Sequence, residues 1–464
     1  MKMRIERDSM GEVEVPAKAY YGVTSTRSIH NFPISGLTVP SEQIAALALL
    51  KLACAKANME LKFLTKKTGD AIVKACREII NGGLRDQFPL DIFQAGSGTS
   101  SNMNINEVIA NRAAELLGGK RGERKLVHPN DHVNMGQSTN NVFPSSIRVA
   151  ALPMVKSLAA QTKRFQKTLA KKARQFDNVI KSGRTHLQDA VPIRMGQVFG
   201  AFSRSMEKDA QRVESKIVHL SELGVGGNAV GTGINTHPNF RRLIIKHLNK
   251  ETGQKFSVAK NGIEATHSTT DLADLSGAVQ TLAVNVARIC NDLRLMSSGP
   301  NTGLNEIDLP TVEPGSSIMP GKINPTMAEA VNMVCLKVFG NHQTVTLAAF
   351  SAQLELNVTM PVTGYALLES LRILANGIKV LDEKCVSGIT INKKQCEWYA
   401  MQSPSIATFL NPVIGYDRAS AVVKQSLREK KTIPEVVLAE KLVSEKELAK
   451  ILDPKKLTSP NRMK

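Results

Sequence analysis

The sequence predicts an all-α protein built on a bundle of long helices. Its residues are 42% hydrophobic but only 4% aromatic, so Leu, Ala, Val and Ile must fill most of the core. Aliphatic side chains in these proportions suit the packing of helix on helix. Long apolar seams recur every three or four residues, and strand-like alternation is rare.

The longest seam begins at Leu272 and continues for about 25 residues without a proline, about 37 Å at the rise of an α-helix. Its apolar positions are separated alternately by three and four residues, as in a helix buried against several partners. They are Leu272, Leu275, Val279, Leu282, Val286, Ile289, Leu293 and Met296.

Three further segments carry helical patterns. One has its stripe at Phe165, Leu169, Phe176 and Ile180, and Pro153 is expected to kink or start its helix. Another helix is expected at about 197–220. The third has its stripe at Val331, Val334, Val338 and Val345.

The two ends of the chain differ from this middle. The first 40 or so residues, rich in Pro and Gly, are expected to be irregular or to hold a short hairpin. The last 70 or so contain shorter helical segments, broken by Pro404, Pro412 and Pro434. We therefore expect a mixed N-terminal domain (1–138), a central long-helix bundle (139–394) and a small helical C-terminal domain (395–464).

Composition limits the classes of function. No apolar run approaches the roughly 18 to 20 residues that span a bilayer, because Lys51 interrupts the run at 45–55. The N-terminus lacks the apolar core of a signal peptide, so a cytoplasmic enzyme without membrane attachment is expected. Six scattered cysteines without a CxxC pair indicate buried free thiols and no metal centre.

The formal charge of +19 does not by itself indicate nucleic-acid binding. Lys and Arg are spread over many helical faces, and the densest runs (121–125 and 428–431) are short. Few aromatic side chains could stack on bases. We expect solvated surface lysines and no nucleic-acid partner, and the charge is compatible with a general attraction for small anions.

Five polar loops separate the helical patterns. Ser, Thr and Asn in any one of them could simply cap a helix or close a turn. Five on one bundle indicate an anion site made of backbone N–H groups, hydroxyls and amides. The loops are AGSGTSSNMNINE (95–107), HPNDHVNMGQSTNN (128–141), GRTHLQDAVP (183–192), GTGINTHP (231–238) and GSSIMPGKINP (315–325).

The loop at 315–325 has the parts needed to remove a proton beside a carboxylate. The resulting dianion requires a cation and aimed N–H donors. Lys322 could supply the charge, the backbone from Ser317 to Met319 the donors, and Asn324 the orientation. Its glycines could let the loop close. A serine is normally too weak an acid to form an alkoxide, so the residues alone favour His186 as the base.

GSSIMPGKINP resembles the GSSxMPxKxNP signature of the fumarase/aspartase superfamily, and four other loops match in the expected order. The resemblance covers nearly the whole chain. It implies that Ser317, the second serine of the signature, is the catalytic base on a mobile loop, ahead of His186.

The resemblance also implies the other site residues. His186 and Lys322 would act in catalysis, and Glu329 would pair with His186. HPND, with His128, Asn130 and Asp131, is similar to a second anion site. The implied substrate contacts are Ser97, Thr99, Ser138, Thr139, Asn140, Thr185, Ile318, Met319 and Asn324.

The resemblance further implies a homotetramer in which each active site draws loops from three chains. It implies no redox cofactor. No metal ligand cluster is visible, so activation by a divalent metal stays open. PGKINP favours a small dicarboxylate over the larger substrates of some superfamily members.

Two activities are compatible with the motifs. YYGV (20–23), QSTN, THLQDA and GLNEIDLP resemble the aspartase members, which implies reversible elimination of ammonia from L-aspartate to give fumarate. GSGTSSNMN, with Ser97, and GEVEVPAKAY resemble class II fumarases, which add water to fumarate. A lyase for another amino- or hydroxy-dicarboxylate is a further alternative. A catalytically silent scaffold is also possible, but the presence of Ser317 and Lys322 disfavours it.

The chain departs from the superfamily pattern at two places. Asn141 stands where both groups usually have Asp, and Thr24 and Ser25 replace the usual Gln-Thr before Arg27. The first change removes one charge beside the QSTN loop.

Overall fold

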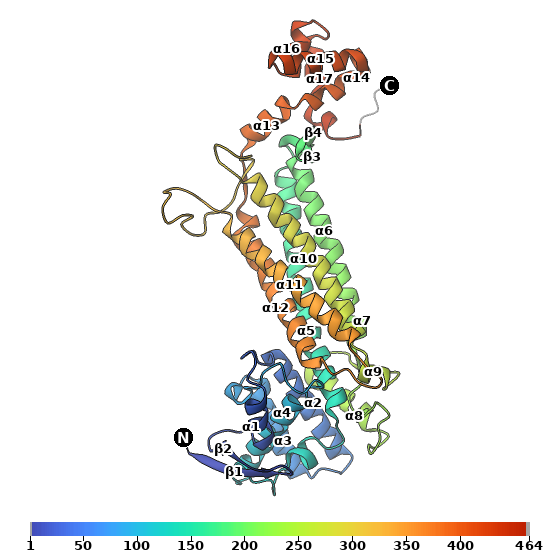
Figure 1. Ribbon diagram of the computed structural model, residues 1–464. Helices are drawn as coiled ribbons and strands as arrows, with labels where there is room; N and C mark the ends of the chain where they lie inside the picture. The colour runs from blue at the N-terminus through green and yellow to red at the C-terminus, as the bar shows by residue number, and fades with distance from the viewer. Residues whose placement is uncertain (1, 461–464) are drawn as a thin grey trace. The chain divides into compact units, whose positions relative to one another are not determined.

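The computed structural model describes residues 2–460 of the 464-residue chain and confirms the all-α class. The chain forms two compact units. The first comprises Met1–Ala159, Gln211–Ala283 and Leu336–Ala375, and the second Ala160–Ala210, Val284–Cys335 and Asn376–Lys464. Five long helices contribute a segment to each unit (Figure 1): α5 Thr139–Gln175, α6 Met195–Ser215, α10 Thr270–Met296, α11 Thr326–Phe350 and α12 Met360–Lys384.

The predicted seam at 272–296 forms the buried stripe of α10. All eight of its apolar side chains are buried, with exposed fractions of 7% or less. On α11, Val331, Val338 and Val345 are buried as well, and Val334 is half-buried. The apolar periodicity therefore predicted both helices and the faces that they bury.

The expectation of a helix start at Pro153 was wrong, and the alternative of a kink there stays a prediction. Helix α5 starts at Thr139 and runs for 37 residues through both Pro144 and Pro153. Pro153 lies on the exposed side of the helix, while Leu152 and Val155 next to it are buried. Burial of these neighbours outweighs the hydrogen bond that proline removes.

The helix expected at 197–220 is confirmed in its main part. It forms α6, which ends at Ser215, and a separate turn, α7 (Ile217–Leu220), follows.

Hydrogen bonds join the long helices within each unit. In the second unit, the amide of Gln166 on α5 donates to Ser203 Oγ on α6 at 2.9 Å. In the first unit, the amide of Asn341 on α11 donates to Ser370 Oγ on α12 at 3.0 Å. Ser203, Asn341 and Ser370 are buried, and buried polar groups are usually hydrogen-bonded in this way.

The first unit also holds an N-terminal hairpin, one of the two alternatives expected for the start of the chain. Strands β1 and β2 pair antiparallel, with Met3 opposite Pro16. The shorter elements of this unit are β1 Met3–Asp8, β2 Gly11–Pro16, α1 Val23–Asn31, α2 Ser41–Glu60, α3 Lys66–Ile80, η1 Arg85–Gln87, α4 Thr99–Leu116, η2 Pro129–Val133, α7, β5 Glu222–Leu223, α8 Phe240–Thr252, β6 Ser257–Val258 and α9 Glu264–His267.

A buried carboxylate on α4 holds the start of α1. Glu107 accepts backbone N–H groups from Gly22, Thr24 and Ser25 and the hydroxyl of Ser25, at 2.6–3.1 Å. An acidic group at a helix N-terminus satisfies donors that have no partner within the helix.

The second unit contains a hairpin that the sequence did not predict, strands β3 and β4, which pair antiparallel. A cluster of buried aliphatic side chains, including Leu410, Val422 and Val436, forms the core of its C-terminal helices. Its shorter elements are β3 Ile180–Thr185, β4 Gln188–Arg194, β7 Ile307–Asp308, η3 Val386–Gly388, β8 Thr390–Ile391, α13 Lys393–Gln402, η4 Pro404–Leu410, α14 Asn411–Ile414, α15 Tyr416–Glu429, α16 Ile433–Ala439, α17 Glu445–Ile451 and α18 Pro454–Leu457.

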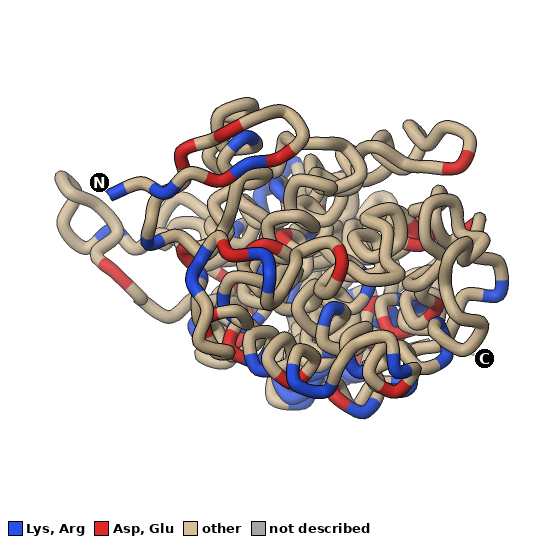
Figure 2. The backbone as a smooth tube through the Cα atoms, turned by 90° about the horizontal axis from the view of Figure 1, so that it is seen from below, with Lys and Arg blue, Asp and Glu red and all other residues tan. Residues whose placement is uncertain are grey.

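The three-domain division stays a prediction, since the two compact units take segments of the same long helices. No helix in residues 2–460 is long and apolar enough to cross a membrane. Acidic residues are interspersed among the basic ones in many segments of the backbone (Figure 2), so the excess positive charge comes from many elements.

Candidate functional site

The loop at 315–325 carries the predicted catalytic serine, exposed, just before α11. The hydroxyl oxygen of Ser316 accepts the backbone N–H groups of Ile318 and Met319 at 3.3 and 3.0 Å. Ser316 thus closes a tight turn around Ser317. The N–H groups of Ile318 and Met319, which we expected to face a carboxylate, are bonded inside the loop in this conformation.

Both ends of this loop are held close together. The side-chain amide of Asn324 donates to the carbonyl of Gly315, and the N–H of Lys322 donates to Met319 at 3.3 Å. A Cβ atom at Gly315 would lie 1.9 Å from the carbonyl oxygen of Lys322, so only glycine fits there. In this conformation Asn324, which was predicted to provide orientation in the site, holds the two ends of its own loop together.

The ends of the loop are held by hydrogen bonds, and the side chains at its tip are exposed to solvent. The Ile318 side chain is 83% exposed, and Ser317 and Lys322 are exposed as well. Gly321 has a left-handed backbone (φ 80°), and a Cβ atom there would meet nothing within 4 Å. An exposed apolar tip on a pinned base is suited to fold over a ligand.

His186 lies at the tip of the β3–β4 hairpin. Thr185 pairs with Gln188, so His186 and Leu187 form the two-residue turn, with φ of 56° and 59°. Two consecutive positive φ angles define the hairpin turn that usually contains Asn or Gly. Thr185 and His186 are exposed at this tip.

A buried carboxylate anchors the base of the hairpin. Glu306 is fully buried and forms ion pairs with Arg184 (2.8 Å) and Lys181 (3.3 Å) of β3. Burial lowers the pKa of Lys181, and the carboxylate of Glu306 opposes that shift. The turn with His186 thus projects from a strand held by charge-assisted bonds.

The predicted pair between Glu329 and His186 is not formed within one chain. Glu329 lies in the first turn of α11, and its N–H donates to Pro325 at 3.1 Å. Across residues 2–460, no hydrogen bond or ion pair joins its carboxylate to His186. The pair stays a prediction for an assembly of several chains.

In the first unit, the loop before α4 brings Ser97 and Thr99 together. Their hydroxyl oxygens lie 2.9 Å apart. Gly98 between them has a φ of 86°, and a Cβ atom there would lie 2.4 Å from the ring of Phe143. The half-buried Ser97 and the exposed Thr99 at the N-terminus of α4 are therefore positioned by a glycine packed against α5.

The predicted residues Ser138, Thr139 and Asn140 lie at the start of α5. Ser138 Oγ accepts the N–H of Asn140 at 3.2 Å, which caps the helix. The amide of Asn102 on α4 donates to Thr139 Oγ1 at 2.9 Å. This bond joins the N-terminal turns of α4 and α5, so the predicted contacts on these two turns are connected.

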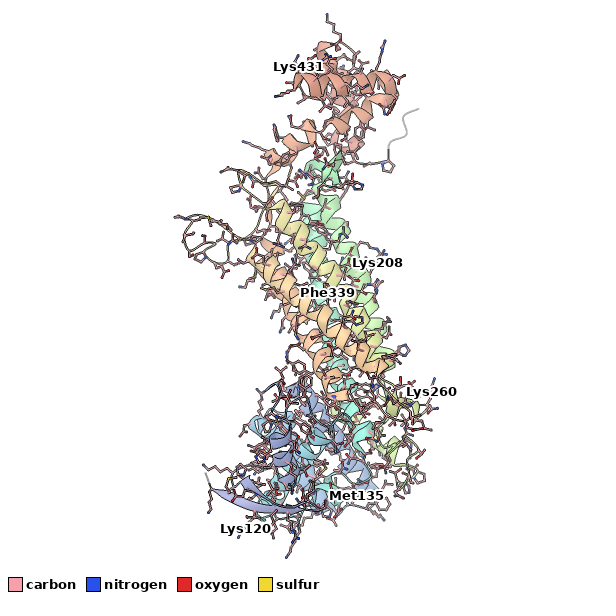
Figure 3. The ribbon with its side chains drawn as sticks, viewed as in Figure 1. Lys120, Met135, Lys208, Lys260, Phe339 and Lys431 are labelled. Carbon is pink, nitrogen blue, oxygen red and sulfur yellow. The ribbon has the colours of Figure 1, made fainter. Side chains whose placement is uncertain are left out.

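A buried lysine that the sequence analysis did not assign to the site lies beneath these turns. Lys51 on α2 is 0% exposed, and its Nζ donates to Asn134 Oδ1 and Gln137 Oε1 at 2.8 and 2.9 Å. Burial lowers the pKa of Lys51 to about 7. The backbone between these partners includes Met135, labelled in Figure 3, whose carbonyl accepts the amide of Asn58 at 3.2 Å.

The network of Lys51 reaches the predicted substrate contacts. Asn134 Oδ1 also accepts the amide of Asn102 at 3.3 Å, and Asn102 donates to Thr139. One signal pointed to this role: Lys51 is the single charged residue in the apolar run at 45–55. A buried cation without a carboxylate is costly, which indicates a function for it.

The HPND loop forms a short helical turn. His128 Nδ1 accepts the N–H groups of Asn130 and Asp131, both at 3.2 Å. These N–H groups are therefore already bonded, and the second anion site stays a prediction. No group of three or more His, Cys, Asp or Glu side chains in the described part of the chain is arranged to hold a metal ion.

The predicted site residues fall into two sets, each ordered within its own unit. The turns of α4 and α5 belong to the first unit, and the loop at 315–325 and the β3–β4 hairpin belong to the second. How several chains combine these sets stays a prediction.

Comparison with known proteins identifies the class. A family profile described as Lyase matches residues 11–340, and a second, described as the fumarase C C-terminus, matches residues 406–459. The fold and the loops thus define a helical lyase. The chain belongs to the fumarase/aspartase superfamily.

Individual relatives match over their whole length. The aspartate ammonia-lyase of Helicobacter pylori is 44% identical over 464 residues, covering 100% of this chain and 99% of the relative. The class II fumarate hydratase of Halobacterium salinarum is 48% identical over 463 residues, covering 98% and 97%. The crystal structure of a class II fumarase from Schistosoma mansoni has a TM-score of 0.95 at 38% identity, covering 99% of this chain and 100% of that one. Both activities occur among similar relatives.

Proposed function

We propose that the chain catalyses the reversible elimination of ammonia from L-aspartate to give fumarate. The observation that carries the proposal is the loop at 315–325, with exposed Ser317 and Lys322 on a pinned base, in a chain of this superfamily. The loop combines an oxygen proposed to act as the base, a cation and backbone donors within a few residues. Elimination beside a carboxylate needs these three components.

In the proposed reaction, Ser317 as its alkoxide takes the proton from C3 of aspartate. The C–H electron pair moves into the carboxylate next to C3, which becomes a dianion facing Lys322 and Asn324. The pair then forms the C2=C3 double bond as the C2–N bond breaks and ammonia leaves. Thr99, Asn140 and His186 would surround the amino group, and Ser138, Thr139 and Thr185 would bind carboxylate oxygens.

Formation of the dianion site requires the Ser316 turn to open. In the resting loop, Ser316 occupies the N–H groups of Ile318 and Met319. A substrate carboxylate could replace this hydroxyl, and a charged acceptor forms the stronger bonds. The loop would then close over the substrate and exclude water. The proposal requires no redox cofactor.

Aspartate is favoured by the sequences of three segments. QSTN (137–140), THLQDA (185–190) and YYGV (20–23) resemble the aspartase members. The Helicobacter pylori relative, which carries that name, matches this chain from end to end.

Hydration of fumarate to L-malate is the second candidate. The observation that favours it is the 48% identity to the class II fumarate hydratase of Halobacterium salinarum. Ser97 in GSGTSSNMN agrees with it. The same base and dianion site would serve, with water in place of ammonia.

We also propose that the chain acts as a homotetramer with active sites shared by three subunits. Large apolar side chains are exposed along one face of α11, with exposed fractions from 62% to 86%: Met333, Leu336, Leu347 and Phe350. Several large exposed apolar side chains on one helix favour an interaction surface. Closed symmetric assembly would bury it.

The first test measures the ultraviolet absorbance of fumarate when the purified chain is mixed separately with L-aspartate and with L-malate. We expect a rise with aspartate alone. A rise with malate alone would identify the fumarase, and the absence of any rise with either would support the silent scaffold and refute the proposal.

Substitution of the two neighbouring serines tests the base. Ser317→Ala should lower kcat by about 10²- to 10⁴-fold, the usual cost of losing a general base. Ser316→Ala is the matched control, because it removes an adjacent hydroxyl that closes the turn but takes no proton. Retention of more than about a tenth of kcat by Ser317→Ala would exclude Ser317 as the base.

A further inference from the structure

Asn141, the residue at which the chain departs from the superfamily pattern, is fully buried at the start of α5. Its exposed fraction is 0%. Its side-chain Nδ2 donates to the carbonyl of Asn228 at 2.6 Å and to Thr266 Oγ1 at 3.3 Å. The preceding Asn140 donates in the same way to the carbonyl of Ala229, at 2.8 Å. Two consecutive amides of α5 therefore bind two consecutive carbonyls of one loop.

The loop that receives these bonds spans residues 226–234 and overlaps GTGINTHP, which the proposed reaction leaves without a role. Its own bonds make it rigid. The amide of Asn228 donates to the carbonyl of Ile234 at 2.6 Å, and Asn228 has a left-handed backbone (φ 58°). Gly231 packs so closely on Gly262 that a Cβ atom would lie 2.1 Å from its carbonyl oxygen. The loop can therefore serve as a fixed platform.

The same platform extends to α9. Thr266 Oγ1 donates its proton to the carbonyl of Gly262 at 2.7 Å, so towards Asn141 it can only accept. The carbonyl of Asn228 is also an acceptor. Both groups facing Asn141 therefore need a donor, which an amide supplies and a carboxylate does not.

The two acceptors also fix which way the Asn141 amide is turned. Its Oδ1 is buried and has no hydrogen-bond partner. Exchange of the two amide atoms would place an oxygen 2.6 Å from the carbonyl of Asn228, which is repulsive. Asn141 also forms no hydrogen bond with an ionisable side chain of the described residues. An ionised Asp here would be a buried charge facing two acceptors.

We infer that Asn141 is a positioning residue for the substrate site, which fixes the first turn of α5, with Ser138, Thr139 and Asn140, on the rigid 226–234 loop through its amide N–H donors. The inference deepens the proposed function, because it rests on that turn being a substrate contact. It gives a reason for the neutral residue at this position. It also gives the GTGINTHP loop a role as a support.

The substitution Asn141→Asp tests this inference through pH. Burial without a partner raises the pKa of a carboxyl by roughly three units, so the side chain should be mostly ionised at about pH 8 and mostly protonated at about pH 6. The protonated acid can donate to the carbonyl of Asn228 and restore the bond. We expect kcat/KM to fall by roughly 10²-fold at the higher pH, the cost of a displaced contact, and to recover at the lower pH relative to wild type.

Asn106→Asp is the matched control. Asn106 on α4 is also 0% exposed, its Oδ1 also lacks a partner, and its amide contacts only Met103 Sδ at 3.6 Å. This variant introduces the same buried carboxyl away from the α5 turn. It should change stability without a pH-dependent change in KM.

A readout that needs no substrate separates this inference from the proposed function. Amide hydrogen exchange of residues 138–142 and 226–234 should increase in Asn141→Asp at about pH 8, after correction for the intrinsic pH dependence, and return to the wild-type level at about pH 6. This pattern supports the inference even if neither L-aspartate nor L-malate reacts. Wild-type exchange and kcat/KM at both pH values would overturn it.

Asn141→Ala covers the case in which the Asp variant does not fold. It removes the donors and introduces no charge. We expect a raised KM and faster exchange of the same two segments at both pH values, with no recovery on acidification. A wild-type KM together with wild-type exchange in this variant would also overturn the inference.

Discussion

Replacement of Lys51 by methionine should remove a defined part of the pH dependence of stability. Lys51 is 0% exposed and has two amide oxygens as partners in place of a carboxylate. Burial lowers its pKa from 10.5 to about 7. Methionine has a similar length and no charge, so Lys51→Met removes the titration and largely preserves the packing.

The sign follows from proton binding in the two states. Above about pH 7 the folded state has released this proton, whereas the unfolded chain retains it up to about 10.5. The unfolded state therefore binds more protons, and the free energy of unfolding rises with pH over this interval. Between about pH 6 and pH 8, a group that titrates near 7 when folded contributes a rise of about 1.4 kcal/mol.

The measurement is chemical unfolding of wild type and variant at about pH 6, 7 and 8, followed by circular dichroism at a fixed protein concentration. Other titrating groups contribute equally to both proteins and cancel in the difference. We expect the wild type to gain about 1.4 kcal/mol more than Lys51→Met across this range.

Lys74→Met is the control, because Lys74 is an exposed lysine of the neighbouring helix α3. It should retain the pH dependence of the wild type. Equal pH dependence in wild type and Lys51→Met would show that Lys51 stays protonated when folded, and the reasoning from burial would be refuted.

Two further predictions concern buried groups outside the loops. Glu107→Gln should lower the free energy of unfolding by about 1–3 kcal/mol, because an amide cannot accept all the N–H groups that the carboxylate accepts from the start of α1. The same chemical unfolding measures this change, and unchanged stability would contradict the role of Glu107. Cys54 should resist alkylation by iodoacetamide in the native protein at about pH 8, because burial raises the pKa of its thiol to about 12. Mass spectrometry of peptides after labelling checks this, with denatured protein as the control, and rapid native labelling would contradict the burial.

Periodicity predicted the long helices because their buried stripes continue over many turns. The seam of α10 contains eight apolar residues at alternating spacings of three and four, a pattern that no other element produces. A single proline is a weaker local signal. Helix α5 therefore starts at Thr139 and continues through Pro153, although the sequence alone suggested a kink or a start there.

The β3–β4 hairpin could not be predicted from its turn. The usual signal is Asn or Gly at positions with positive φ, and this turn contains His186 and Leu187. The strands are held instead by distant residues, above all Glu306, which pairs with Lys181 and Arg184. Contacts between residues that are far apart in the chain cannot be recognised from the sequence of a short segment.

The sequence predicted the loops of the candidate site, but it did not predict the interactions of the residues that support these loops. The loops contain unusual combinations of Gly, Ser, Thr and Asn, which motif reasoning detects. The supports Lys51 and Asn134 come from distant segments, and only the fold brings them together. The state of the loop at 315–325 was also hidden, since the bonding of two of its N–H groups to Ser316 depends on backbone geometry.

The Ser316 turn has a consequence for the design of inhibitors. A compound that offers only a carboxylate must displace the hydroxyl of Ser316 before it gains the two N–H donors of Ile318 and Met319. Part of its binding energy is consumed by this exchange, and its association is slowed by the opening of the turn. A compound that binds the closed turn through the exposed side chains of Ile318 and Met319 avoids that cost and would hold the enzyme in its resting form.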